Sequence, residues 1–168
     1  VIENPLQCKF DPQVLQCKAA DGADCLTAQQ VESAKKIYAG VTHNRTKQSI
    51  VAGFSPGSEL NWQTMAGPQP FAPGLDLFRY VVFSDPNWDF KTLNWDAHID
   101  QTLKASASMD ALNPDLKPYF DRGGKIISYH GWADPQISPG STAAYYDSVM
   151  NKMGGASKVQ ESFRLFMV

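Results

Sequence analysis

Asp134 occupies a position where a functional carboxylate is expected in an open α/β sheet. A β-favouring run over 125–130 precedes it, and the loop 131–136 follows that run directly. Functional groups in such sheets gather in the loops just past the carboxyl ends of strands. A carboxylate there can orient a histidine that takes a proton from serine. The alternative is that Asp134 only caps a turn before Pro135, which is a common role of Asp-Pro.

The other candidate side chains do not form a complete catalytic set. His130 ends the same strand, and we expect it to satisfy a local hydrogen bond rather than to act as a base. His43 and His98 have no ligand-like spacing to Cys, Asp or Glu, and the sequence has no zinc motif, phosphate loop or dinucleotide fingerprint. It also lacks a Gly-x-Ser-x-Gly turn. Ser58 lies in a predicted turn without a base nearby, so we interpret it as structural. No organic cofactor is expected.

Several aromatic residues stand in loop-like surroundings, among them Trp62, Trp88, Phe90 and Trp95. Their rings could line a pocket for a planar aromatic substrate, and we take Trp62, Trp88 and Phe90 as the pocket candidates. The alternative is that they hold the loop-rich half of the chain together, which is the more common role for any single ring.

The elements that must position Asp134 form a regular pattern after about residue 122. Strands are predicted over 125–130 and 162–168. Between them a helix is predicted from an N-cap at Ser141 to about Met153, where two glycines stop it. This is a βαβ unit, so we expect parallel strands with a right-handed crossover. The fold class is therefore α/β.

The chain before residue 122 is rich in Pro, Gly, Trp and Asn. One helix begins at Thr27, which forms a capping box with Gln30, and ends at Gly40. Residues 41–74 are predicted to be irregular, because prolines and glycines interrupt them. The apolar run 77–83 is too short for its periodicity to decide between helix and strand.

Two further helical segments are predicted ahead of the βαβ unit. One covers 96–109, with Ile99, Leu103 and Ala107 on its inner face, and the other covers one or two turns over 114–120. A loop-rich stretch as long as this one usually covers a site or belongs to a larger assembly. We therefore interpret it as a lid.

Composition excludes some classes of function. The chain of 168 residues has a net charge of −2 with both signs scattered along it, which offers no footprint for nucleic acid or an anionic membrane surface. No apolar run approaches the ~20 residues needed to span a bilayer. Neither nucleic-acid nor membrane partners are expected. The chain opens on Val1-Ile2 and stops within an apolar strand pattern, so we expect both ends to be internal to a longer protein.

The cysteines are odd in number. Cys17 and Cys25 flank a turn-rich loop that could close a short disulfide, which leaves Cys8 alone. One reading is three free thiols in a cytosolic protein. The other is an oxidised, secreted protein in which the partner of Cys8 lies upstream of residue 1. Asn44-Arg45-Thr46 is a glycosylation sequon and gives mild support to secretion.

Several motifs together resemble the tannase and feruloyl esterase family, and the resemblance covers nearly the whole chain in the expected order. The residues that carry it are Cys25-Leu26-Thr27, Tyr38-Ala39-Gly40, Pro56-Gly57-Ser58-Glu59, Phe78-Arg79-Tyr80-Val81-Val82-Phe83, Asp85-Pro86-Asn87-Trp88, Met109-Asp110-Ala111-Leu112-Asn113-Pro114-Asp115-Leu116, Arg122-Gly123-Gly124-Lys125 and Tyr129-His130-Gly131-Trp132-Ala133-Asp134-Pro135-Gln136-Ile137.

The resemblance implies part of an α/β-hydrolase fold. Residues 1–118 would be a large, loop-rich lid, and 119–168 the end of the catalytic domain. In the family the triad serine lies in a Cys-Ser-Thr-Gly-Gly-type motif well upstream. The histidine lies in a Pro-Gly-Met-x-His-Cys-type motif, directly after a strand resembling 163–168. Only Asp134 carries over, as the residue that orients the histidine.

The resemblance also implies a structural calcium ion and a disulfide pattern. The family's lid holds calcium in an Asp-rich loop ending in Asp-Gly-Val-Ile, so Val1 would donate its backbone carbonyl, with the carboxylate ligands upstream. The lid cysteines would pair Cys17 with Cys25, and Cys8 with a cysteine just before the calcium loop.

The expected function is hydrolysis of phenolic acid esters, feruloyl or galloyl, by a secreted serine esterase. The rest of that enzyme, with its serine and histidine, is the expected partner, and this chain alone is expected to be inactive. Two alternatives stay open. One is a non-catalytic, calcium-stabilised module that binds aromatic compounds or sugars, and the other is an esterase for different aromatic esters.

Overall fold

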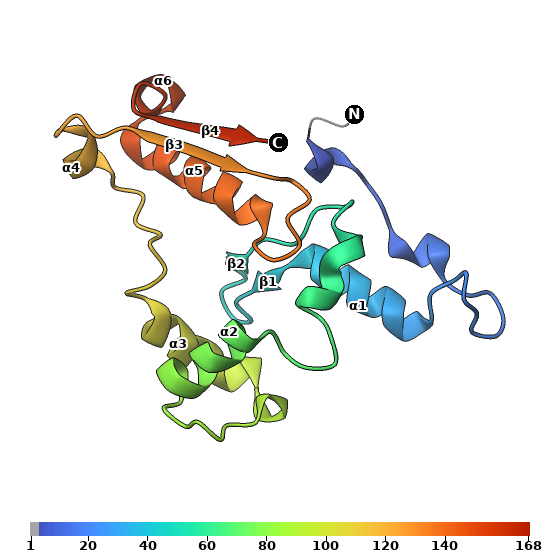
Figure 1. The fold of residues 1–168 in the computed structure, drawn as a ribbon. Coiled ribbons are helices and arrows are strands. Elements are labelled where there is room, and N and C mark those ends of the chain that lie inside the picture. Colours follow the sequence, from blue (N-terminus) through green and yellow to red (C-terminus); the bar gives the residue numbers. More distant parts are fainter. Residues whose placement is uncertain (1–3) are drawn as a thin grey trace.

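The computed structural model describes residues 4–168, which form a loop-rich helical region followed by a βαβ region (Figure 1). The helices and strands are α1 (Ala28–Ala39), β1 (Val41–Thr42), β2 (Ser49–Val51), α2 (Ala72–Asp76), α3 (Trp95–Ser106), α4 (Lys117–Phe120), β3 (Ile126–His130), α5 (Pro139–Met153), α6 (Ala156–Val159) and β4 (Phe163–Met167). Short 3-10 helices cover Pro5–Gln7, Pro12–Leu15, Glu59–Thr64 and Phe90–Thr92, and Leu77–Val82 is a π-helical segment. None of the described helices is long and apolar enough to cross a membrane.

The βαβ unit is confirmed. β3 and β4 pair in parallel, with Ile126 opposite Phe163 and His130 opposite Met167. α5 connects them, and Val149, Val159 and Phe163 form a buried core beneath the sheet. Alternation of buried and exposed residues along both strands and an apolar stripe on α5 produce this core.

The N-terminus of α5 differs from the prediction. The helix begins at Pro139 with Ser138 at the N-cap, so Ser141 lies in the first turn and is not the cap. Proline suits the first helical position because its φ is already helical and it needs no acceptor there. Ser138 Oγ donates instead to the Gly53 carbonyl at 3.0 Å, and Ser141 Oγ accepts from the Ala52 N–H at 3.1 Å. The two hydroxyls thus join α5 to the loop-rich region.

One face of the two-stranded sheet is bare within residues 4–168. α5 packs against the other face (Figure 1). Ile127 is 77% exposed and Tyr129 79% exposed on β3, and Phe166 on β4 is 52% exposed. Parallel strands are normally covered on both faces. This apolar face is therefore suited to burial against further structure.

α1 has the predicted capping box. The Thr27 N–H donates to Gln30 Oε1 at 2.8 Å, and the Gln30 N–H donates to Thr27 Oγ1 at 3.2 Å. Gly40 ends the helix at a φ of 72°, which favours glycine. The chain after β2 then crosses the end of α1 so closely that a Cβ on Gly53 would lie 1.8 Å from the Tyr38 carbonyl oxygen.

The prediction of an irregular segment over 41–74 is wrong in part. β1 and β2 form a short antiparallel pair, and 3-10 and α-helical turns cover Glu59–Thr64 and Ala72–Asp76. Two strands of two to three residues leave no periodic signal in the sequence. α2 carries Pro73 in its first turn, where proline is tolerated.

The segment ahead of the βαβ unit is helical. The run 77–83 is resolved as helix, with the Phe83 N–H donating to the Phe78 carbonyl. α3 ends at Ser106 rather than at Met109, and Ile99 is buried while Leu103 is partly buried. Ala107, predicted to face inward, is exposed because it lies at the C-cap, past the last turn that packs.

Candidate active site

Asp134 is held by hydrogen bonds to both carboxylate oxygens. Its Oδ1 accepts from the backbone N–H groups of Gln136, at 2.8 Å, and Ile137, at 3.0 Å. Its Oδ2 faces His130 Nε2 at 3.3 Å. Asp134 therefore does cap the turn, but only through Oδ1. Its Oδ2 takes no part in the cap and can bind a histidine.

These bonds favour the ionised form of Asp134. The Ile137 N–H has the largest effect on the pKa of the carboxyl, and the Gln136 N–H and His130 add to it. Together they outweigh the opposing effect of partial burial, so the pKa lies below its ordinary value. A carboxylate that orients a histidine must carry its charge at neutral pH, and Asp134 meets this condition.

His130 satisfies local hydrogen bonds, as expected. Its Nδ1 lies 2.7 Å from Thr142 Oγ1 on α5, and its Nε2 faces Asp134. Both ring nitrogens are engaged, so His130 has no free nitrogen with which to act as a base. Thr142 was not found from the sequence, because only the packing of α5 on β3 brings it to the end of that strand.

The acid-bearing loop is joined to the end of β4. The Trp132 N–H donates to the Val168 carbonyl at 2.7 Å, and the Val168 N–H donates to the His130 carbonyl at 3.0 Å. The carboxyl ends of β3 and β4 thus share one edge, with Asp134 in the loop beside it.

Ser58 is structural, as interpreted. It is 2% exposed, and its hydroxyl donates to the Ser55 carbonyl at 2.7 Å. The same hydroxyl accepts from Trp62 Nε1 at 2.9 Å. The described residues place no base against it, so it lacks the activation that a nucleophile needs.

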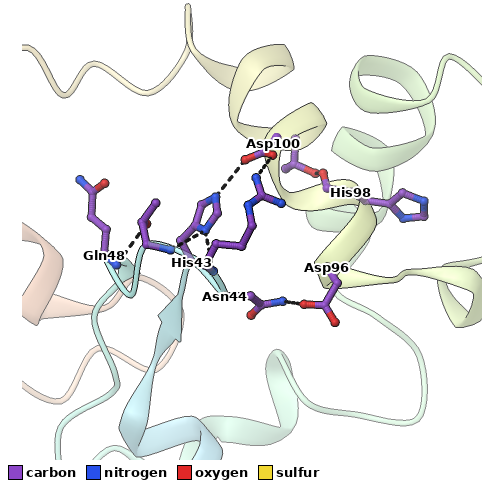
Figure 2. A network of polar contacts seen from close by, with 9 residues as sticks. His43, Asn44, Gln48, Asp96, His98 and Asp100 are labelled. Carbon is purple, nitrogen blue, oxygen red and sulfur yellow. Dashed lines mark hydrogen bonds and ion pairs between the residues drawn. The ribbon is translucent and has the colours of Figure 1, made fainter.

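His43 belongs to a separate polar network that joins the β1–β2 turn to α3 (Figure 2). Its Nε2 lies 2.9 Å from Asp100 Oδ1, and its Nδ1 accepts from the N–H groups of Arg45 and Thr46. Both ring nitrogens are hydrogen-bonded and the residue is 6% exposed. His43 therefore connects the β1–β2 turn to α3 and does not act as a base. Arg45 also pairs with Asp100. These bonds, that from His43 first, hold the pKa of Asp100 below its ordinary value.

His98 and the sequon flank the same network. Figure 2 shows His98 pointing away from His43; its ring packs edge-on against Phe83 with centroids 5.1 Å apart. Asn44 Nδ2, the atom a glycan would modify, donates to Asp96 on α3.

The three pocket candidates lie in different surroundings. Trp62 lines a mainly apolar groove of about 770 Å³ beside α1. Trp88 stacks on Phe78 and Phe83, with centroids 5.3 and 4.9 Å apart. Phe90 is 36% exposed on its 3-10 helix. The structure therefore does not gather them into one pocket, and Trp88 has the bracing role weighed as the alternative.

A hydrogen-bonded tyrosine–glutamate pair lies among the residues that line this groove. The Tyr38 hydroxyl donates to Glu59, and the Tyr38 ring packs on Trp62 with centroids 5.0 Å apart. Burial, and then Glu59, raise the pKa of Tyr38. Burial raises the pKa of Glu59, but hydrogen bonds from Tyr38 and the Gly57 N–H outweigh it, so the net shift is downward. The groove thus carries one fixed carboxylate among apolar walls.

The cysteine pattern matches the oxidised reading in part. Cys17 and Cys25 are joined by a disulfide with their Cα atoms 5.0 Å apart. Cys8 is exposed and has no disulfide partner among residues 4–168.

Calcium binding cannot be placed on the described residues. Val1, the carbonyl donor implied by the resemblance, lies outside them. Within residues 4–168 no group of three or more His, Cys, Asp or Glu side chains could hold a metal ion. These residues therefore do not by themselves fit the calcium site, and no chemical step is assigned to an ion.

Proteins of known sequence resemble this chain over its full length. Feruloyl esterase C of Talaromyces stipitatus is 32% identical over 171 residues, which cover 100% of this chain and 32% of that protein. An uncharacterized esterase of Xanthomonas campestris is 30% identical over 198 residues, which cover 100% of this chain and 34% of that protein.

Solved structures of esterases share the fold of this chain. Feruloyl esterase B of Aspergillus oryzae matches with a TM-score of 0.88 at 30% identity, over 99% of this chain and 34% of that one. The tannin acyl hydrolase of Aspergillus niger, at 21% identity and a TM-score of 0.71, shares the fold. The chain thus spans about a third of the length of the relatives it matches. The profile described as "Tannase and feruloyl esterase" matches residues 1–168, and the chain belongs to the tannase and feruloyl esterase family.

Proposed function

We propose that this chain is part of a secreted serine esterase that cleaves phenolic acid esters. Residues 1–118 supply a lid, and 119–168 supply the end of an α/β-hydrolase domain. Asp134 orients a histidine, which takes the proton from a serine as the serine oxygen attacks the ester carbonyl. The alcohol leaves, and water then releases the phenolic acid from the acyl-enzyme. The serine and histidine lie outside residues 1–168.

The observation that carries this proposal is the state of Asp134. It sits past the carboxyl end of β3, ionised, with Oδ1 saturated by two backbone N–H groups. A loop that follows β4 would leave the sheet beside it, because Val168 is hydrogen-bonded into the Asp134 loop. A histidine carried by that loop would come within reach of Oδ2.

The bare sheet face supports a larger catalytic domain. Ile127, Tyr129 and Phe166 expose apolar area on a two-stranded parallel sheet. Parallel sheets with such sequences are covered on both faces in α/β proteins. We propose that strands and helices of the rest of the enzyme cover this face.

The Cys17–Cys25 disulfide supports an extracellular location, because disulfides persist in oxidising compartments. The exposed Cys8 is proposed to pair with a cysteine outside this chain. A structural calcium ion bound mainly by upstream carboxylates, and a glycan on Asn44, complete the proposal.

Phenolic acid esters fit the family description and the name of a relative, feruloyl esterase C. Assays on methyl ferulate, methyl gallate and a terephthalate monoester distinguish feruloyl, galloyl and other aromatic esters as the substrate.

A second candidate function is a non-catalytic module that binds aromatic compounds or sugars. The groove of about 770 Å³, walled by rings such as Trp62 and Tyr38, favours it. Such a module would bind without turnover, so the same assays separate the two functions.

The test uses the full-length protein that carries this chain. Wild type is expected to hydrolyse one of the three esters and to be labelled by a fluorophosphonate on a serine outside residues 1–168. Asp134→Asn is expected to lower kcat by about four orders of magnitude with an unchanged melting temperature. Asp110→Asn, an exposed carboxylate away from the site, is the matched control.

Residues 1–168 expressed alone are expected to show neither turnover nor label. Near-normal turnover in Asp134→Asn would remove Asp134 from the triad. Saturable binding of methyl ferulate with no turnover and no label would favour the binding module.

A further inference from the structure

The second oxygen of Asp134 has one partner among the described residues, and that partner is itself fixed. His130 Nε2 lies 3.3 Å from Asp134 Oδ2, while Oδ1 is already saturated by two N–H groups. The imidazole is 12% exposed and the carboxylate 34% exposed. His130 therefore lies behind Asp134, on the protein side, and the outer edge of the carboxylate stays open.

Asp134 and Thr142 together decide which nitrogen of His130 carries the proton. Its Oγ1 lies 2.7 Å from Nδ1, and a hydroxyl can either donate or accept there. If Thr142 donates, the proton sits on Nε2 and points at the carboxylate. If Thr142 accepted from a neutral ring, the bare Nε2 lone pair would face a negative oxygen. The charge on Asp134 thus selects the tautomer in which Thr142 donates to His130 and His130 donates to Asp134.

We propose that His130 and Thr142 form a positioning relay that sets the direction of the Asp134 carboxylate. This proposal rests on the role of Asp134 as the triad acid. Two N–H donors hold Oδ1, and His130 occupies one lone pair of Oδ2. Rotation of the carboxylate about its Cβ–Cγ bond would therefore break at least one of these hydrogen bonds. The remaining lone pair of Oδ2 is then directed outward, towards the catalytic histidine.

The relay links three elements of the fold. His130 ends β3, Asp134 lies in the loop after it, and Thr142 lies in the first turns of α5. Ser138 and Ser141 in turn join that end of α5 to Gly53 and Ala52. The orientation of the acid is therefore set by the packing of α5 on β3, with the loop-rich region attached at the same helix end.

An alternative interpretation is that Thr142, His130 and Asp134 form a catalytic triad of their own, as nucleophile, base and acid. Thr142 is a partly buried helical residue, and its β-branched side chain has restricted rotamers there. Its hydroxyl is hydrogen-bonded to His130 and does not point towards the open edge of the Asp134 carboxylate. We therefore assign Thr142 to positioning, and the variants below separate the two roles.

The experiment measures kcat and KM of full-length protein on its best ester, with melting temperature as a check on folding. His130→Leu removes the donor and is expected to lower kcat about tenfold with KM unchanged. His130→Gln keeps a neutral N–H donor and is expected to stay within about threefold of wild type. Thr142→Val, which is isosteric, should lower kcat about threefold, and Thr142→Ser should restore it.

The double variant His130→Leu/Thr142→Val is expected to match His130→Leu, because Thr142 acts only through the imidazole. Unchanged kcat in His130→Leu, or equal losses in His130→Leu and His130→Gln, would overturn the relay. A Thr142→Val variant as inactive as Asp134→Asn would overturn it in favour of Thr142 as nucleophile. If Asp134→Asn itself keeps its activity, the triad role fails; if it is inactive while His130→Leu is normal, only the relay fails.

Discussion

The βαβ region and the loop-rich region hold their side chains in place by different means. In the first, parallel strands and a helix bury Val149, Val159 and Phe163 in one core. That core fixes where β3 ends and therefore where Asp134 lies. Side-chain hydrogen bonds add to this core, and three of them act on the Asp134 carboxylate itself.

The loop-rich region relies on side-chain contacts and a covalent link. A disulfide closes the loop before α1, and stacked rings brace the segment between the π-helical turn and α3. The His43 network ties the β1–β2 turn to α3. This difference fits the proposed function, in which the loop-rich region is a lid and the sheet gives Asp134 the rigid support that catalytic geometry needs.

The largest effect on stability is expected from the core of the βαβ region. Phe163→Ala should cost about 3–5 kcal/mol of the free energy of unfolding, because it opens a cavity under the sheet. Hydrogen exchange should show lost protection in β3, β4 and α5 with α1 unaffected. Lys152→Ala, exposed on α5, is the control and should change stability by less than about 0.5 kcal/mol. Equal loss of protection in α1 would show that the two regions unfold as one unit.

The loop-rich region should respond most to loss of its disulfide. Cys17→Ala/Cys25→Ala is expected to cost about 2–3 kcal/mol, since the bond closes a short loop. The loss should appear as faster exchange at the start of α1, measured beside a urea titration. Lys18→Ala in the same loop is the control. A change spread evenly into the βαβ region would contradict the separation of the two regions.

A smaller effect is expected at the cap of α1. Thr27→Ala removes the acceptor for the Gln30 N–H and should cost about 1 kcal/mol. Thr27→Ser keeps the hydroxyl and should be close to neutral. Thermal melts of the two variants make the comparison, and equal destabilisation by both would mean that the methyl group and not the cap matters.

The smallest effect is expected at Asp100, and it depends on pH. The pKa of Asp100 in the folded protein is lowered, first by His43 and then by Arg45. The ionised carboxylate therefore contributes fully to the free energy of unfolding above its pKa in the unfolded chain, which is about 3.9. This contribution is lost as pH falls through the folded pKa. The difference in melting temperature between wild type and Asp100→Asn should be constant near neutral pH and vanish in acid. Asp76→Asn is the control, and a difference that grows in acid would contradict the assignment.

Several elements were predictable because their signals are local. Thr27, Gln30 and Gly40 mark both ends of α1 with their own side chains and backbone. Glycines flank β3 and stop α5, so the limits of these elements show in the sequence. The β1–β2 pair was missed because strands of two and three residues are too short for periodicity, and Ala107 was misplaced because helix ends depend on what packs there.

By itself, the sequence determined the parallel βαβ unit, the loop that carries Asp134, the capped helix α1 and the family. The elements depend on patterns within some fifteen neighbouring residues, roughly the length of a helix or a strand with its turn. The family depends on motifs spread over nearly the whole chain. Only the tertiary structure decided that Thr142 reaches His130, that Ser138 and Ser141 bond to residues 53 and 52, and that Trp62 and Trp88 lie in different surroundings. Those contacts join segments far apart in the chain, and they form only when α5 packs against the sheet and the loops close around it.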